Sequence, residues 1–411
     1  MKIICKLAWK NLTANRKRML FTLLCVILSV SMIGVVLGIS DSILQNADYD
    51  GDSENERATK AICIGFVVIS CFMSCFSICT AFSISIQDRI KNYGFLTSIG
   101  MSEGQMSALI MTEAAIYGVF GVSIGTFLGF GMASWFYGII SELLLIEEKI
   151  SIGRFVLSGG SVALSLILGL FTVLIASFFP LLRMKKLSVT ETIKDNSQIN
   201  ISLKQSLLSK ITEKLFGRIG LLAGQNYDNN KVKYRALSLT LSGGATFFIT
   251  IYSFFRYPIW YELQSNDYVS SFYDIWYQLS NASSVLMGFF VLVFLICSMG
   301  SYRQNMEQRK KEFAMYKSMG MQNSELQKIM SIESIFFTWY AIWFGLIGSL
   351  IGNYALCTYF RIIGVDDLKF HFPIEVFCAF VLFDLAVGFL FALYSRMKVS
   401  KVNIIETIRN N

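Results

Sequence analysis

The chain has 411 residues, of which 54% are hydrophobic and only 16% are charged, and its formal net charge is +8. This composition excludes an ordinary soluble globular protein, because so much apolar surface could not be kept away from water. A nucleic-acid partner is not expected either, since no basic face on a soluble module accompanies the positive charge.

Eight apolar windows are long enough to cross a bilayer, which takes roughly 20 residues of helix. They lie at about residues 19–39, 61–86, 109–138, 158–182, 236–256, 280–300, 330–358 and 374–394. The first window is too long for a signal peptide and has no obvious cleavage site, so we expect it to be retained. The sequence therefore predicts an all-α polytopic membrane protein with eight transmembrane helices.

Basic residues indicate how these helices are oriented. The first 18 residues hold six Lys or Arg and no acid, and such segments stay on the cytoplasmic side. An even number of spans returns the chain to the side on which it began. We therefore expect a multi-pass plasma-membrane protein with both its N-terminus and its C-terminus in the cytoplasm.

Nine cysteines are present, and four of them lie in the second window. Cys71, Cys75 and Cys79 recur at helical spacing, with Cys63 two turns earlier. A path for soft metal ions would use such a row, but thiols also pack well between helices. Because the chain has a single histidine, His371, we expect packing and no metal site.

The sequence repeats itself in two halves, residues 1–200 and 201–411. Each half has a polar lead-in, four apolar windows and a short basic tail. The loops QDRIKNYGFLTSIGM (87–101) and QRKKEFAMYKSMGM (308–321) align on one glycine, and an acid follows each at the same offset. The lead-ins AWKN and AGQN and the tails SVTETIK and NIIETIR also match. Such duplication predicts two pseudo-symmetric units that contact one two-fold partner.

Each repeated loop has the residues of a short rigid helix. Charge comes from Arg89, Lys91, Arg309, Lys310, Lys311 and Glu312, and an apolar face comes from Tyr93, Leu96, Ile99 and Phe313. Gly100 and Gly320 are expected just after the helix, where a left-handed backbone favours glycine. The alternative is an ordinary basic cytoplasmic loop, which the duplication argues against.

These motifs, in this order and in two copies, resemble the permease subunits of the FtsX-like, MacB-type ABC transporters. The resemblance implies that residues 89–101 and 309–321 are coupling helices that bind in clefts of a separate cytoplasmic P-loop ATPase dimer. The implied coupling residues are Arg89, Lys91, Tyr93, Gly94, Ser98, Gly100, Met101, Arg309, Lys311, Glu312, Phe313, Ser318, Gly320 and Met321. The chain itself contains no GxxxxGK[ST] loop and no Ser-His-Asp or HExxH set, so we expect neither a cofactor nor enzymatic activity in it.

Three acids lie in apolar windows, where an ionisable group is costly. Glu113 and Glu333 lie near the cytoplasmic ends of their helices, and we expect them to fix the coupling helix to its span. A role in binding substrate or protons is the alternative. Asp384 lies near the middle of the eighth window, either as a hydrogen-bond partner in helix packing or on a substrate path.

Small residues recur every fourth position in the third and seventh windows. They are Gly121, Gly125 and Gly129, and Ala341, Gly345 and Ser349. Such rows let helix backbones approach closely in lipid. We expect simple bundle packing, with a moving seam between the two halves as the alternative.

The external loops are short, whereas many relatives carry a large external domain. This form is more similar to antimicrobial-peptide export or immunity permeases of Gram-positive bacteria. An aromatic external patch that includes Trp260 and Trp276 either contacts an amphipathic peptide or lipid or forms an interfacial belt. The predicted function is export, or release from the outer leaflet, of a peptide-like or lipid-like substrate. The alternatives are an ion-gradient transporter and a sensory scaffold that signals to a kinase.

Overall fold

A computed structural model of the chain describes residues 2–14, 16–46, 53–87, 90–145, 155–185, 207–229, 231–265, 270–362, 370 and 372–400. All regular structure in these residues is helical, and eight helices are long and apolar enough to cross a membrane. The spans are Arg18–Gln45, Cys63–Ser83, Glu103–Gly138, Gly159–Phe178, Leu237–Phe254, Met287–Glu307, Asn323–Tyr359 and Ile374–Lys398. The predicted all-α polytopic fold with eight spans is confirmed.

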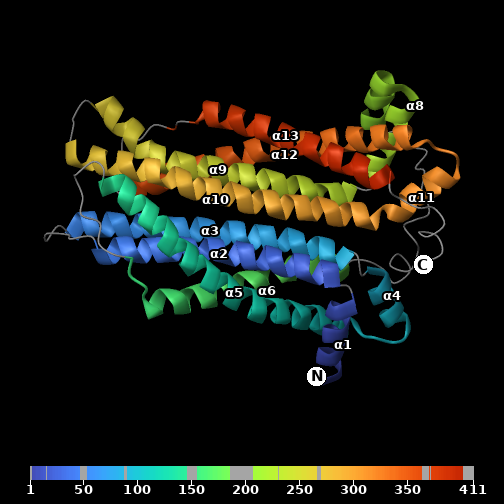
Figure 1. Cartoon of the computed structure of the whole chain (residues 1–411), viewed down its shortest axis with the longest axis horizontal. Coiled ribbons are helices and arrows are strands. Elements are labelled where there is room, and N and C mark those ends of the chain that lie inside the picture. Colours follow the sequence, from blue (N-terminus) through green and yellow to red (C-terminus); the bar gives the residue numbers. More distant parts are fainter. Residues whose placement is uncertain are drawn as a thin grey trace.

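The helices follow the same order in both parts of the chain (Figure 1). The first set is α1 (Lys2–Ala14), α2 (Arg16–Asn46), α3 (Ser53–Gln87), α4 (Ile90–Ser98), α5 (Glu103–Leu145) and α6 (Gly159–Lys185). The second set is α8 (Leu207–Asn229), α9 (Lys231–Ser265), α10 (Ser270–Gln308), α11 (Lys310–Ser318), α12 (Asn323–Ile362) and α13 (Ile374–Ser400). Each set places a nine-residue helix, α4 or α11, between its second and third spans.

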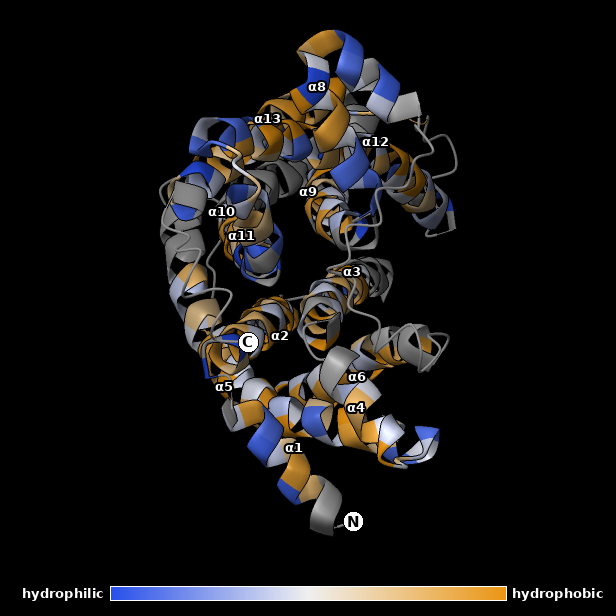
Figure 2. Cartoon of the chain, turned by 90° about the vertical axis from the view of Figure 1, so that its right-hand side faces the viewer, coloured by the Kyte–Doolittle hydropathy of each residue, from blue (hydrophilic) through white to orange (hydrophobic). Residues whose placement is uncertain are grey.

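The long helices run side by side along the length of the molecule, and the short ones gather at one end (Figure 1). We call the end that holds α1, α4, α8 and α11 the short-helix end. There α1 and α8 project sideways from the bundle in opposite directions, as both views show (Figures 1 and 2). Large apolar side chains cover the outer faces of the spans, among them Phe127 and Leu382, as a lipid environment requires.

The closest helix pairs lie within each half. In the first half α2 packs on α5, and in the second half α9 packs on α12. The two halves meet chiefly where α3 contacts α9 and α10. Aromatic side chains cross this junction, with Phe66 and Phe254 4.5 Å apart and Phe136 and Phe289 5.5 Å apart between ring centroids. The two halves therefore meet through side chains, whereas the backbones of the paired helices within each half lie closer together.

Glycines set the distance between α2 and α5. A Cβ atom at Gly125 would lie 2.8 Å from the carbonyl oxygen of Ile27, and one at Gly129 would lie 2.7 Å from that of Ser31. Gly121 faces Val26 in the same row. The two backbones thus touch without side chains between them.

The corresponding row on α12 packs against α9, again within one half. Ala341 and Ser349 are buried, and a Cβ at Gly345 would lie 3.1 Å from the Cβ of Ala245. The closest approaches on α12 are at Gly348 and Gly352, which face Thr246 and Thr250 and do not belong to the predicted row. Both rows thus lie at packing contacts inside a half, and the main contacts between the halves are elsewhere.

The helices extend beyond the apolar windows from which they were predicted. For example, α5 begins at Glu103 and α10 begins at Ser270, six and ten residues earlier than their windows. Polar residues continue each helix where it leaves the apolar layer. The repeated tails at 186–193 and 401–408, together with His371, lie outside the described residues.

We predict that Gly129→Val destabilises the protein by about 1–3 kcal/mol, because the added methyl groups force the α2 and α5 backbones apart. The matched control is Gly131→Val, two residues along the same helix, where a Cβ would have nothing within 4 Å. Thermal denaturation of both variants in detergent, followed by size-exclusion chromatography, measures the difference. Equal melting of the two variants would contradict the packing described for Gly129.

Candidate functional site at the short-helix end

The helices α4 and α11 end in the same way. Gly100 and Gly320 adopt the left-handed region, with φ of 104° and 93°, as their sequence positions predicted. In α4 the amide of Met101 donates to the carbonyl of Leu96 at 3.0 Å, and in α11 the amide of Met321 donates to that of Tyr316 at 3.1 Å. This Schellman pattern stops each helix abruptly and turns the chain toward the next span.

A capping box begins the next span only one residue later. Ser102 and Gln105 exchange two bonds, in which the Ser102 amide donates to Oε1 of Gln105 at 3.1 Å and the Gln105 amide donates to Oγ of Ser102 at 3.3 Å. At the equivalent point of α12 the amide of Gln322 donates to Oε2 of Glu325 at 3.1 Å. Each nine-residue helix is therefore joined to its span by a short link in which both ends are capped.

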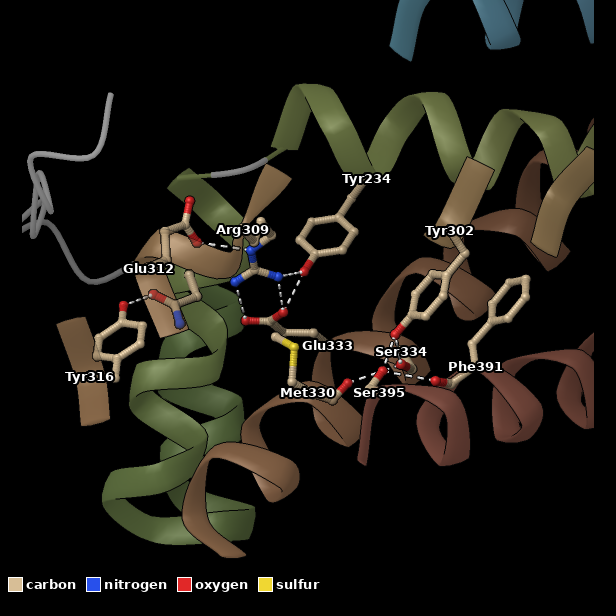
Figure 3. A network of polar contacts seen from close by, with 11 residues as sticks. Tyr234, Tyr302, Arg309, Glu312, Tyr316, Met330, Glu333, Ser334, Phe391 and Ser395 are labelled. Atoms are coloured by element: carbon tan, nitrogen blue, oxygen red, sulfur yellow. Dashed lines mark hydrogen bonds and ion pairs between the residues drawn. The ribbon is translucent and has the colours of Figure 1, made fainter. Parts of the chain in front are cut away.

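Arg309 and Glu333 form a buried ion pair at the start of α11 (Figure 3). The Arg309 guanidinium donates to the two carboxylate oxygens of Glu333 at 2.6 and 3.3 Å. The Tyr234 hydroxyl accepts from Arg309 and donates to Glu333, and the Nε of Arg309 donates to Glu312 at 2.8 Å. The network thus joins the beginning of α9, the start of α11 and the third turn of α12.

Little water reaches this pair. The side chains of Arg309 and Glu333 are 1% and 2% exposed, and the ring of Phe313 lies 5.2 Å from the guanidinium carbon. Burial lowers the pKa of Arg309, but Glu333, Tyr234 and Glu312 together outweigh it, so the pKa lies well above its usual range. Burial raises the pKa of Tyr234 well above its ordinary value, which keeps its hydroxyl protonated.

Further polar contacts extend this arrangement to neighbouring helices. The Tyr316 hydroxyl of α11 donates to Oδ1 of Asn226 in α8 at 2.7 Å. The Tyr302 hydroxyl of α10 bonds to Ser395 of α13 and lies 3.3 Å from the hydroxyl of Ser334 in α12 (Figure 3). With α9, which contributes Tyr234, six helices of the second half are therefore connected by polar side chains near the short-helix end.

The first half has a related contact around Glu113, which is 5% exposed. The Asn11 amide of α1 donates to its Oε1 at 3.4 Å, and the Tyr93 hydroxyl of α4 donates to its Oε2 at 3.4 Å. Asn11 and Asn226 occupy matching positions in the two lead-ins. In both halves a buried glutamate of the third span therefore contacts polar groups from helices that precede that span.

The residues of the apolar face predicted for α4 and α11 divide between buried and exposed positions. Tyr93 and Phe313, both predicted on the apolar face, are buried against their own half. The outward apolar residues are Phe95 on α4, Ile99 just after α4 and Met319 just after α11, exposed by 65%, 69% and 66%. Ser98, Gly100, Ser318 and Gly320 are exposed beside them, Gly94 is buried, and Met101 and Met321 are half-buried.

The expectation that Arg309 supplies surface charge is wrong, because Glu333 and Tyr234 hold it inside the protein. Glu312 is turned toward Arg309 with a side chain that is 19% exposed. Arg89 lies outside the described residues, as do the side chains of Lys91 and Lys311.

The suggested substrate path is described only in part. Asp384 of α13 is 1% exposed, and its Oδ1 has no hydrogen-bond partner among the described residues. The side chains of Trp260 and Trp276 lie outside the described residues. Within the described part of the chain, no group of three or more His, Cys, Asp or Glu is placed to hold a metal ion.

Several partners in these networks were not predicted from the sequence. Tyr234, Tyr316 and Asn226 come from three helices far apart in the chain, and no local pattern links them to Glu333. Asn226 alone carried a signal, because it matches Asn11 in the repeated lead-in.

A comparison with protein families agrees with the repeat. The family described as "FtsX-like permease C-terminal" matches residues 64–189 and again residues 284–404. The two matches together cover more than half of the chain. Each contains one nine-residue helix with the spans on either side of it. A search of curated proteins found no match.

We predict that Glu333→Ala lowers the free energy of unfolding by about 3–5 kcal/mol, because it leaves the Arg309 charge buried without a partner. Replacing both residues with methionine removes that charge, and this double variant should unfold much closer to wild type. Denaturation of the purified proteins in detergent provides the measurement.

Lys398→Ala is the matched control for an exposed pair. Lys398 lies 3.2 Å from Glu307, and both side chains are more than a third exposed. Its loss should cost only about 0–1 kcal/mol. Equal losses in the free energy of unfolding for Glu333→Ala and Lys398→Ala would show that the buried pair stabilises the protein no more than the exposed one.

Proposed function

We propose that this chain, which belongs to the FtsX-like permease family, is the membrane subunit of an ABC transporter whose ATP hydrolysis occurs on a separate subunit. The observation that carries the proposal is the pair of nine-residue helices at one end of the bundle. Each ends at a left-handed glycine, is linked tightly to a span and exposes apolar side chains. Two such helices in one chain match the two subunits of an ATPase dimer.

The short-helix end is proposed to face the cytoplasm. The N-terminal segment that leads into α2 is rich in Lys and Arg and has no acid. Such segments are retained on the inner side of the membrane. This orientation places α4 and α11 where a cytoplasmic ATPase can reach them, and it places α1 and the end of α13 on the same side.

Movement would pass from the ATPase to the spans through the short links. When the dimer closes on ATP, it would displace α4 and α11 together. Their links to α5 and α12 contain few residues, and both ends of each link are capped by hydrogen bonds. Because α5 touches α2 and α12 touches α9, a displaced span would carry most of its half with it.

The proposed substrate is a peptide-like or lipid-like molecule that is exported or released from the outer leaflet. The connections at the end opposite the short helices are short, so this chain offers no large external domain in the sequence between its spans. A compact permease of this form suits antimicrobial-peptide export or immunity in a Gram-positive plasma membrane.

A second candidate function is transport driven by an ion gradient. Asp384 favours it, because a carboxylate in a span is costly and its Oδ1 has no partner among the described residues. A secondary transporter would need several ionisable groups to meet near the middle of the bilayer. The duplicated helices favour the ATPase-driven permease instead.

We predict that the double variant Phe95→Asp/Ile99→Asp loses its ATPase partner. The aspartates would place charge in the apolar contact, and co-purification of a P-loop ATPase from native membranes should fall roughly tenfold or more. Mass spectrometry of the proteins bound to the tagged chain gives the measurement.

The control substitution is Leu157→Asp, at the opposite end of the bundle. Leu157 is 60% exposed, so the charge should be tolerated and the partner retained. Absence of any ATPase from the wild-type preparation, with the protein folded and abundant, would refute the proposed function.

A further inference from the structure

The helix α8 is a hairpin that projects from the bundle. Its two arms meet at Gly217, whose φ of 63° breaks the helix. A Cβ at Gly224 on the second arm would lie 2.7 Å from the Cα of Ser209 on the first, so the arms pack backbone to backbone. The bend at residues 213–218 is thus held in place by the arms behind it.

The base of this hairpin is fixed to a membrane span. The ring of Tyr227 stacks on Tyr340 of α12 with centroids 5.7 Å apart, and Phe336 lies 5.6 Å away. Both partners belong to the span Asn323–Tyr359. From that base α8 extends sideways past α13, as both views show (Figures 1 and 2). A segment that leaves the end of a membrane bundle sideways runs along the bilayer surface.

The tip combines large apolar side chains with positive charge. Leu215 and Phe216 are 69% and 52% exposed. Lys210, Lys214 and Arg218 are exposed around them, with Glu213 as the acid among them. Apolar side chains that enter the boundary of the acyl chains, surrounded by basic residues, are typical of segments that bind anionic lipid surfaces.

We propose that the α8 tip, residues 210–218, is a binding site for the phosphate groups of anionic lipids in the leaflet at the short-helix end. Lys210, Lys214 and Arg218 donate to phosphate oxygens, while Leu215 and Phe216 insert below them. A partner that binds α4 and α11 approaches from beyond the end of the bundle, whereas the α8 tip points away to the side (Figure 2). Lipid is therefore the occupant that the geometry favours over a protein.

A spin label at Leu215→Cys tests the proposal in the full chain. The exposed cysteines Cys5 and Cys378 are first replaced by serine. The labelled protein is placed in nanodiscs of phosphatidylcholine with or without phosphatidylglycerol, and collisions of the label with oxygen and with a water-soluble nickel chelate are compared. Phosphatidylglycerol should raise the ratio of oxygen to nickel accessibility. A label at the exposed Ser318 should respond to neither lipid.

Neutralising the three basic residues as Lys210→Gln, Lys214→Gln and Arg218→Gln should remove this response. Each charge is expected to change the ratio of docked to undocked tip about fivefold. Glu213→Gln is the matched control and should keep the response.

Two results would overturn the proposal. One is equal nickel accessibility at position 215 in both lipid compositions. The other is protection of that position in native membranes but not in either nanodisc, which would indicate a protein partner. Neither readout requires ATP or an ATPase, so the outcome is separate from that of the proposed function.

Discussion

The buried ion pair between Arg309 and Glu333 determines how the second half is assembled at the short-helix end. A paired charge in this position is tolerated only when its remaining hydrogen bonds are made, and here Tyr234 and Glu312 complete them. Because these groups come from the beginnings of α9 and α11 and from α12, the pair places α11 relative to two spans at once. Glu113 has the same place in the first half, with Asn11 and Tyr93 as partners.

The buried contacts around Glu333 and Glu113, together with the helix packing, determine which parts of the protein can move. Each nine-residue helix is tied to its span by capped links, and the spans touch their neighbours in the same half through glycine. The contact between the halves depends instead on side chains of α3, α9 and α10. Side-chain interfaces can slide or separate at lower cost than backbone contacts, so we infer that a displacement of α4 and α11 would be accommodated between the halves. Lipid bound at the α8 tip would hold the base of the second half against the leaflet during that displacement.

The features predicted from the sequence are those encoded locally or by the repeat. Apolar windows long enough for a bilayer gave the eight spans, and the duplicated glycines marked the ends of α4 and α11. The sequence could not show which face of each short helix is buried, because that depends on contacts with distant residues. Arg309 therefore resembled a surface charge, and Tyr234, 75 positions earlier in the chain, gave no sign that it contacts Arg309. The apolar windows also made the helices too short, because polar residues such as Glu103 continue a helix beyond the apolar layer.

The most direct test of the central claim is photo-crosslinking in native membranes, with a benzophenone amino acid placed separately at Ile99 and at Met319. Both positions are exposed at the short-helix end, one beside each nine-residue helix. The account predicts that each yields an adduct with the same P-loop ATPase, while a probe at Leu157 yields none. Adducts with an ATPase from only one position, or from neither, would contradict the claim that α4 and α11 together receive the two subunits of the ATPase dimer.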